Sequence, residues 1–177
     1  LFNNFQAAKK VTLALMALIR TQYPRDTMYI IGFSDYAREI KEEELAKTSW
    51  NAWVSGTNLH HALMLSRKLL AKEKGGTRQI LCITDGEPTA HLEGDRAFFS
   101  YPPSYRTEQE TLKEVKRCTQ EDIVINTFML ENNYQLVNFA DRMTRINQGR
   151  AFYTSAGSIG EFMLVDYVNN RRKRVAA

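Results

Sequence analysis

Apolar residues recur at helical spacing in five stretches of the chain. From Phe5 to Leu18 every third or fourth residue is apolar, and lysines and polar residues fill the opposite face, which predicts an amphipathic helix over residues 5–22. The same spacing predicts helices over 58–74, 107–118, 134–146 and 158–169. Gly75-Gly76 ends the second helix. Capping boxes at Thr107–Glu110 and Ser158–Glu161 start the third and the fifth.

Short apolar runs lie between these helices. Residues 28–33, 80–83, 123–130 and 151–153 have strand length and almost no polar interruption, and residues 36–40 suit a short edge strand. Nearly continuous apolar runs are typical of strands that are buried on both faces. Strands that alternate with helices predict an α/β fold, a doubly wound and mainly parallel sheet flanked by helices.

The segment from Gly86 to Arg106 shows neither the helical spacing of apolar residues nor a strand-like pattern. We expect a long irregular loop there, and loops of that length inside a compact domain are usually functional. It carries Phe98, Phe99 and Tyr101, which we expect to contact a partner.

Composition narrows the class of protein. The 177 residues suit one domain, and 24 Lys and Arg against 20 Asp and Glu give a net charge of only +4. The basic run at 171–174 lacks interleaved aromatics, so it is interpreted as a solvated helix end, with no nucleic-acid partner expected. No apolar run reaches membrane-span length, so no membrane partner is expected either. Cys82 and Cys118 lie in apolar contexts without metal-ligand spacing, which favours core positions and a reducing, cytoplasmic location.

The three histidines do not predict a metal site. His60 and His61 are adjacent on a predicted helix, so their side chains diverge by about 100° and cannot hold one ion together. We expect one of them to be buried and the other to lie at the surface. His91 falls in the expected loop.

Two polar segments stand where an α/β sheet binds its ligands. Asp85 directly follows a buried strand, and Ser55-Gly56-Thr57-Asn58 opens a helix. Ligands of open parallel sheets bind at the carboxyl ends of the strands, and a carboxylate with a hydroxyl suits Mg²⁺ better than zinc or copper. Two structural alternatives stay open: Asp85-Gly86 as a simple turn, and Thr57 or Asn58 as a helix cap.

These segments resemble a known family. Ser55-Gly56-Thr57-Asn58-Leu59 followed by Ile83-Thr84-Asp85-Gly86-Glu87-Pro88 is similar to two of the three parts of the metal-ion-dependent adhesion site (MIDAS) of von Willebrand factor A (VWA) domains. The resemblance implies that Thr57 and Asp85 are ligands of a Mg²⁺, Mn²⁺ or Ca²⁺ ion. It also implies a partner-binding surface around that ion, formed by Ser55, Gly56, Asn58, Gly86, Glu87, Phe98, Phe99 and Tyr101.

One part of the family pattern is absent from residues 1–177. The Asp-x-Ser-x-Ser loop and the strand before it are not in the sequence, and in this family that strand is central in the sheet. Without it, both neighbouring strands would expose unpaired backbone groups. We therefore expect residues 1–177 to form a single VWA-like domain that is a fragment, or a domain completed by another polypeptide.

The resemblance implies a non-enzymatic protein-interaction module with no catalytic residues. Bacterial intracellular relatives often act beside AAA+ ATPases, as in metal chelatases, so an AAA+ ATPase is the expected kind of partner. Two alternatives remain, a scaffold domain that needs no metal and a phosphoryl-transfer enzyme that uses Asp85. The dinucleotide glycine fingerprint and the phosphate-binding loop are absent from the sequence.

Overall fold

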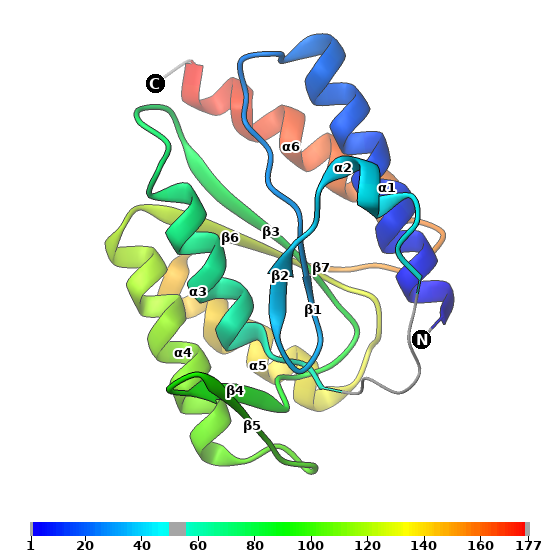
Figure 1. Cartoon of the computed structure of the whole chain (residues 1–177). Coiled ribbons are helices and arrows are strands. Elements are labelled where there is room, and N and C mark those ends of the chain that lie inside the picture. The colour runs from blue at the N-terminus through cyan, green and yellow to red at the C-terminus, as the bar shows by residue number, and fades with distance from the viewer. Residues whose placement is uncertain (1, 50–55, 176–177) are drawn as a thin grey trace.

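The computed structural model describes residues 2–49 and 56–175, and the side chains up to residue 170. Helices cover both faces of a central sheet in it (Figure 1). The helices of the described part are α1 (Phe2–Gln22), α2 (Glu42–Leu45), α3 (Leu59–Leu70), α4 (Tyr105–Gln120), α5 (Tyr134–Asn147) and α6 (Ile159–Val175). The strands are β1 (Ile31–Phe33), β2 (Ala37–Glu39), β3 (Arg78–Thr84), β4 (Ala90–Glu93), β5 (Arg96–Phe99), β6 (Ile123–Met129) and β7 (Ala151–Tyr153).

The central sheet is parallel and has the order β3-β6-β7. Ile80 of β3 pairs with Ile125 of β6, and Thr127 of β6 pairs with Ala151 of β7. The chain passes through α4 between β3 and β6 and through α5 between β6 and β7. These crossovers confirm the predicted α/β class with helices around a parallel sheet.

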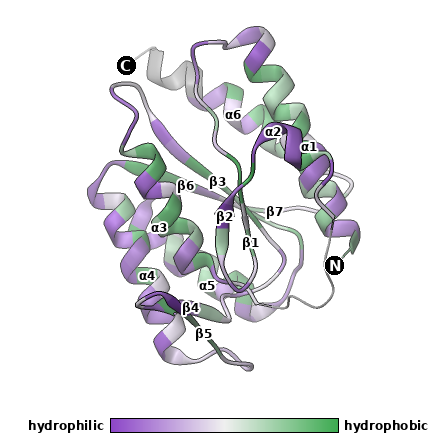
Figure 2. Cartoon of the chain, viewed as in Figure 1, coloured by the Kyte–Doolittle hydropathy of each residue, from purple (hydrophilic) through white to green (hydrophobic). Residues whose placement is uncertain are grey.

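The sheet separates two apolar cores. Residues of α3, α4 and α5 form one core with Cys82, and α1 and α6 form the other with Phe128. Along β3, Ile80 packs with the first core and Leu81 and Ile83 with the second. Successive side chains of a strand point to opposite faces, so the apolar run is explained by burial on both sides. Figure 2 shows that apolar and polar residues alternate along the helices.

β1 and β2 form a separate antiparallel hairpin. Phe33 pairs with Ala37, and the backbone N–H of Ala37 donates to His61 Nδ1 at 2.8 Å, which fixes the hairpin to α3. The predicted strand over 28–33 is shorter in the structure, since only Ile31–Phe33 is strand. Within residues 2–49 and 56–175, no strand pairing joins β1 to β3.

The expectation of an irregular loop over 86–106 is wrong in its central part. β4 and β5 pair there as an antiparallel hairpin, with Ala90 opposite Phe99 and Glu93 opposite Arg96. The two-residue connection places Gly94 at φ 63°, a conformation that glycine adopts without steric cost. The segment is therefore an ordered extension of the domain.

Two helices, α4 and α2, differ from expectation, whereas the start of α6 agrees with it. α4 begins before Thr107, because Ser104 Oγ is the cap that accepts the Thr107 N–H at 3.1 Å. α6 begins directly after Ser158, as predicted, and extends beyond residue 169. The four-residue α2 was not predicted, because it is too short to show a period.

The two cysteines occupy the core, as expected. Cys82 and Cys118 are buried free thiols on the α3 side of the sheet, and burial raises the pKa of each to about 12. Among the described residues, no helix is both long and apolar enough to cross a membrane.

A buried ion pair joins α3 to α4 and gives the first prediction. The fully buried Glu114 accepts from Arg67 Nε and Arg117 Nη1, each at 2.7 Å. Glu114→Ala removes both charge-assisted bonds, so we expect a loss of about 2 kcal/mol in the free energy of unfolding, measured by urea denaturation. Glu110→Ala, which removes the exposed pair with Lys113, should cost less than about 0.5 kcal/mol. Equal losses in the two variants would contradict this assignment.

Candidate metal and partner site

The loop before α3 is held at the carboxyl edge of the sheet by Asn58. This side chain is fully buried, and its Oδ1 accepts the His61 N–H at 2.9 Å as the α3 cap. Its Nδ2 donates to the Asp35 carbonyl at 2.8 Å, and its backbone N–H donates to the Ser34 carbonyl at 2.8 Å. The start of α3 is therefore attached to the residues that follow β1.

Gly56 makes the close approach between these two loops possible. A Cβ at this position would lie 2.1 Å from Asp35 Oδ1, so no larger residue fits without a shift. Asp35 was missed by the sequence analysis, although it follows a strand at the same edge as Asp85. The rule that ligands bind at strand carboxyl ends would have found it.

Thr57 is tied to the loop that follows β3. Its backbone N–H donates to Thr89 Oγ1 at 2.9 Å, and its carbonyl accepts the N–H groups of Thr89 and Ala90 at 3.0 and 3.3 Å. Because the loop that ends at Thr89 begins at Asp85, the structure brings the two predicted ligand loops to one edge. These bonds use the backbone of Thr57, and none of them occupies its hydroxyl.

Asp85 is contacted by the first turn of α1. Asn4 Nδ2 donates to Asp85 Oδ2 at 3.3 Å and to Glu131 Oε1 at 3.0 Å, so residues from α1, β3 and the end of β6 meet here. The N-terminal end of a helix also favours a nearby negative charge. Asn4 and Glu131 were not predicted as site residues, since they are far from Asp85 in the sequence.

The other predicted residues of the edge lie beside Asp85 or outside the described part. A Cβ on Gly86 would meet open space within 4 Å, which shows an accessible backbone. Glu87 is half-buried, and desolvation raises its pKa. Ser55 lies outside the described residues.

The donor set fits a metal only in part. A carboxylate at Asp85 and a hydroxyl at Thr57 are hard oxygen ligands, and Mg²⁺ commonly keeps several waters with few protein ligands. Within the described part of the chain, no three His, Cys, Asp or Glu side chains lie close enough together to hold an ion. The described residues therefore provide part of a coordination shell and not a closed cage.

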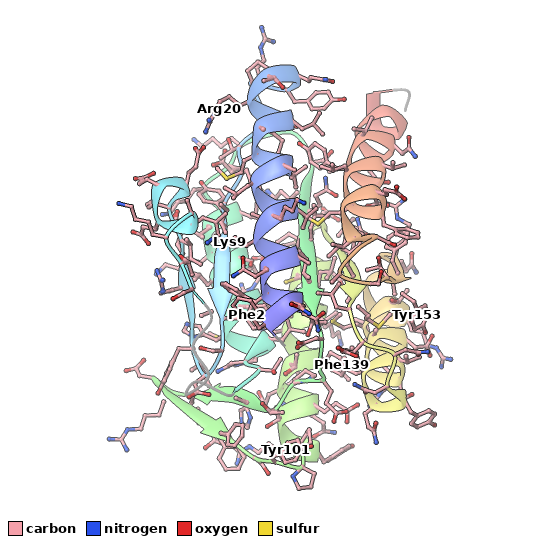
Figure 3. All side chains as sticks on the ribbon, turned by 90° about the vertical axis from the view of Figure 1, so that its right-hand side faces the viewer. Phe2, Lys9, Arg20, Tyr101, Phe139 and Tyr153 are labelled. Atoms are coloured by element: carbon pink, nitrogen blue, oxygen red, sulfur yellow. The ribbon has the colours of Figure 1, made fainter. Side chains whose placement is uncertain are left out.

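Exposed aromatic rings extend from this edge along the β4–β5 hairpin. Phe98, Phe99 and Tyr101 are 41%, 47% and 80% exposed, and Tyr101 lies at the tip of the molecule in Figure 3. The Ser100 N–H donates to the Thr89 carbonyl at 3.0 Å, which connects this aromatic surface to the residue that holds Thr57. The predicted partner-binding rings are thus exposed and attached to the candidate site.

Two histidines hold the hairpin on the domain. His60 Nδ1 accepts the Leu92 N–H at 3.1 Å, and the fully buried His91 contacts Thr107 Oγ1 at 2.8 Å and Glu93 Oε1 at 3.1 Å. The expected loop position of His91 is therefore wrong. His60 is buried as expected for one of the pair, whereas His61 is partly buried instead of lying at the surface.

The fold and this edge define the class of the protein: an α/β domain with the order of elements and the strand-end loops of VWA domains. Residues 2–168 match the family described as Rv0959-like protein, vWA domain, and the chain belongs to this family. Uncharacterized proteins of Mycobacterium tuberculosis and Mycobacterium bovis are 35% identical to it over 176 residues, which is 97% of this chain. The chain spans only 26% of the length of these relatives.

A solved structure shares the fold. Proximal thread matrix protein 1 from the mussel byssus aligns with 91% of this chain and 39% of its own chain, at a TM-score of 0.63 and 15% sequence identity. A second crystal form of that protein gives a TM-score of 0.58. At this identity the likeness supports the architecture alone.

The contacts of Asn58 predict a local stability effect. Asn58→Ala removes the cap of α3 and the bond to the Asp35 carbonyl at a buried position, so we expect a loss of about 2 kcal/mol in urea denaturation. Asn133→Ala removes the exposed cap of α5 and should cost about 1 kcal/mol or less. If Asn58→Ala proved no more destabilising than Asn133→Ala, the attachment of α3 to β1 would not matter energetically.

The histidine contacts predict a pH dependence. Desolvation lowers the pKa of His60 and His61 below the ordinary 6.5, although Glu114 and Glu110 oppose this at His60, where His91 and Arg117 act in the same direction as burial. Both rings use Nδ1 as an acceptor, so protonation would break the bonds to Leu92 and Ala37. The unfolded chain then binds more protons near pH 6, and stability is full above pH 6.5 and falls as the pH drops below it.

Urea denaturation at pH 7.5 and pH 5.5 measures this effect. The native protein should be less stable at pH 5.5, and the His60→Gln/His61→Gln variant should lose much less on the same change. If the variant lost as much stability as the native protein between pH 7.5 and pH 5.5, groups other than His60 and His61 would cause the effect.

Proposed function

We propose that the domain is a non-enzymatic protein-interaction module whose partner binds at the carboxyl edge of the sheet, through a divalent metal held in part by Thr57 and Asp85. The main support comes from the hydrogen bonds between Thr57 and Thr89, which connect the loop that carries Thr57 to the loop that begins at Asp85. Membership of the VWA family supports the interaction role.

The residues of this edge would have different roles in metal binding. Asp85 supplies the negative charge and Thr57 a neutral oxygen, while Asn4 orients the Asp85 carboxylate through its amide. Bound Mg²⁺, Mn²⁺ or Ca²⁺ would supply an open coordination position for a partner carboxylate. Ser55, Gly56, Asn58, Gly86 and Glu87 would frame that position.

The aromatic hairpin would supply apolar contact beside the metal. Phe98, Phe99 and Tyr101 are exposed and attached through Ser100 to Thr89, and aromatic residues at an interface carry much of its binding energy. An AAA+ ATPase in the cytoplasm is the proposed kind of partner, and nucleic acid and membranes are not. The relatives are about four times longer than the region that this chain matches.

A metal-independent scaffold is the second candidate. It is favoured by the observation that no set of three acidic, His or Cys side chains comes together in the described part of the chain. In that case the aromatic hairpin alone would form the binding surface.

Metal titration of the full-length protein separates the two candidates. We expect Mg²⁺ and Mn²⁺ to raise the melting temperature in a saturable manner, because a ligand that binds only the native state stabilises it. Asp85→Asn keeps an acceptor for Asn4 and removes the charge, so it should weaken metal affinity by about tenfold or more, which is a loss of about 1.4 kcal/mol.

Asp95→Asn is the matched control, since Asp95 is an exposed aspartate in the turn of the β4–β5 hairpin. It should leave the metal response unchanged. A native protein that shows no thermal response to either ion would eliminate the metal-dependent proposal and leave the scaffold.

A further inference from the structure

The strand β7 lies at one edge of the central sheet. The strand order is β3-β6-β7, and within residues 2–49 and 56–175 no strand pairs with β7 on the side away from β6. An edge strand presents unpaired backbone N–H and C=O groups, which can pair with a strand of another chain. The outer side of β7 is therefore a candidate interaction surface.

The hydrogen bonds to β6 show which backbone groups of β7 are unpaired. The Arg150 carbonyl accepts an N–H of β6 at 2.8 Å, and the Thr154 N–H donates to a carbonyl of β6 at 2.9 Å. Successive residues of a strand direct their backbone groups to opposite sides, so Phe152 also faces β6, whereas Ala151 and Tyr153 face away from it. Among the described residues, the N–H and C=O groups of Ala151 and Tyr153 have no hydrogen-bond partner.

Apolar side chains flank this edge on both faces of the sheet. Phe152 stacks on the buried Phe128 with 5.0 Å between the ring centroids, and Phe162 of α6 lies 6.1 Å from Phe152. Phe162 is exposed, as is Val165 one turn further along α6. Tyr153 lies on the other face of the sheet and is also exposed, at the margin of the domain in Figure 3. Apolar side chains that gather at the surface are typical of a protein contact.

The charges beside this edge are balanced within the chain. Arg150 Nη2 pairs with Asp166 Oδ1 at 2.8 Å, and Asp166 is buried. The Arg150 guanidinium also lies 6.0 Å from the centroid of the Phe152 ring. Edge strands are commonly protected from pairing by a charged side chain such as lysine, but β7 consists of Ala, Phe and Tyr. Two such edges can therefore approach each other without repulsion between like charges.

The sequence of the edge is complementary to itself. In an antiparallel pair centred on Phe152, Ala151 lies opposite Tyr153 of a second copy, and the outward groups of these residues form two hydrogen bonds in each of the two pairs. The small Ala151 side chain leaves room for the Tyr153 ring. Phe152 meets Phe152 of the second copy as a cross-strand aromatic pair. Arg150 falls opposite Thr154 and not opposite a like charge.

We propose that β7 pairs with β7 of a second copy of this chain, antiparallel and about a two-fold axis, so that two domains share one continuous sheet. A two-fold contact uses the same surface on both copies, as this register requires. Phe162 and Val165 would extend the contact from the strand to α6. A strand of a different protein could also pair with β7, but the complementarity of the edge with itself favours a second copy.

The dimer is a property beyond the proposed partner binding. β3, whose following loop carries Asp85, is at the opposite end of the strand order from β7. The dimer contact thus uses neither Thr57 nor Asp85, and it leaves the β4–β5 hairpin to a different partner. Metal chelation and Asp85→Asn should not change the dimer, so failure of the metal proposal and failure of the dimer proposal give different results.

Sedimentation velocity of the full-length protein tests the dimer. We expect the native protein to be a dimer at about 10 µM. Tyr153 is 55% exposed, so Tyr153→Lys adds a charge to the edge without disturbing the core, and it should raise the Kd of the dimer at least about tenfold. Tyr105→Lys makes the same change at an exposed tyrosine of α4 and should leave the dimer intact. A native monomer at about 100 µM, or a dimer that Tyr153→Lys does not weaken, would overturn the proposal.

Two further variants test the backbone pairing itself. Tyr153→Pro removes the outward N–H, and edge strands accept proline where the N–H points away from the sheet. Tyr153→Ala removes the ring and keeps the N–H. We expect the proline variant to raise the Kd of the dimer at least about tenfold more than the alanine variant. Equal effects would show that side chains alone form the contact and would overturn the strand pairing.

A cross-link tests the register and does not depend on a disruptive variant. In the proposed pair, the Cα atoms of the two residues 153 lie about 9 Å apart. Tyr153→Cys should therefore be joined into a covalent dimer by a short bismaleimide, above the background of the native protein. Tyr105→Cys is the control and should stay at that background. If Tyr153→Cys gave no more covalent dimer than Tyr105→Cys, the proposed register would be wrong.

Discussion

Thr57 and Asn58 make the hydrogen bonds on which the arrangement of the domain depends. Asn58 binds the residues after β1, and Thr57 binds Thr89 in the loop after β3. These two residues therefore join the separate hairpin to the parallel sheet at the start of α3, and Asn58 is fully buried there. Because a buried amide that loses its partners is costly, the hydrogen bonds of Asn58 stabilise this junction.

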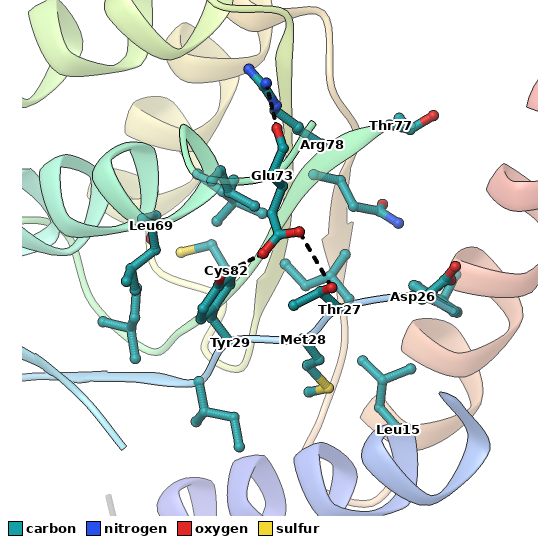
Figure 4. A pocket seen from close by; sticks show the side chains of 18 of the residues that line it. Leu15, Asp26, Thr27, Met28, Tyr29, Leu69, Glu73, Thr77, Arg78 and Cys82 are labelled. Carbon is teal, nitrogen blue, oxygen red and sulfur yellow. Dashed lines mark hydrogen bonds between the residues drawn. The ribbon is translucent and has the colours of Figure 1, made fainter. Parts of the chain in front are cut away.

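The edge that we propose for binding also carries hydrogen bonds that hold the elements of the domain together. His61 and His60, in the first turn of α3, accept backbone N–H groups from β2 and β4, so the same turn also places the aromatic hairpin. Away from this edge, a cavity of about 650 Å³ lies between β1 and β3, and side chains of α1, α3 and α6 line it as well (Figure 4).

The longer elements could be predicted from the sequence because each has a strong physical period. The apolar run of residues 80–83 in β3 packs against cores on both faces of the sheet, and α1 and α3 show apolar stripes. The β4–β5 hairpin lacked such a signal: Ala90 and His91 are adjacent and both buried, so no alternation marks the strand. Asp85 was proposed from its place after a strand and Thr57 from the resemblance to VWA domains, whereas Asn4 could not be proposed, since it reaches Asp85 across 81 positions and Glu131 across 127.

We propose that the carboxyl edge binds a divalent ion between the loops of Thr57 and Asp85. Anomalous diffraction from crystals of the full-length protein grown with Mn²⁺ tests it most directly. We expect a manganese peak at coordination distance, about 2.0–2.3 Å, from an Asp85 carboxylate oxygen, with Thr57 on the same side of the ion. A map at millimolar Mn²⁺ with no peak at this edge, or with one elsewhere on the domain, would show that Thr57 and Asp85 do not hold the ion.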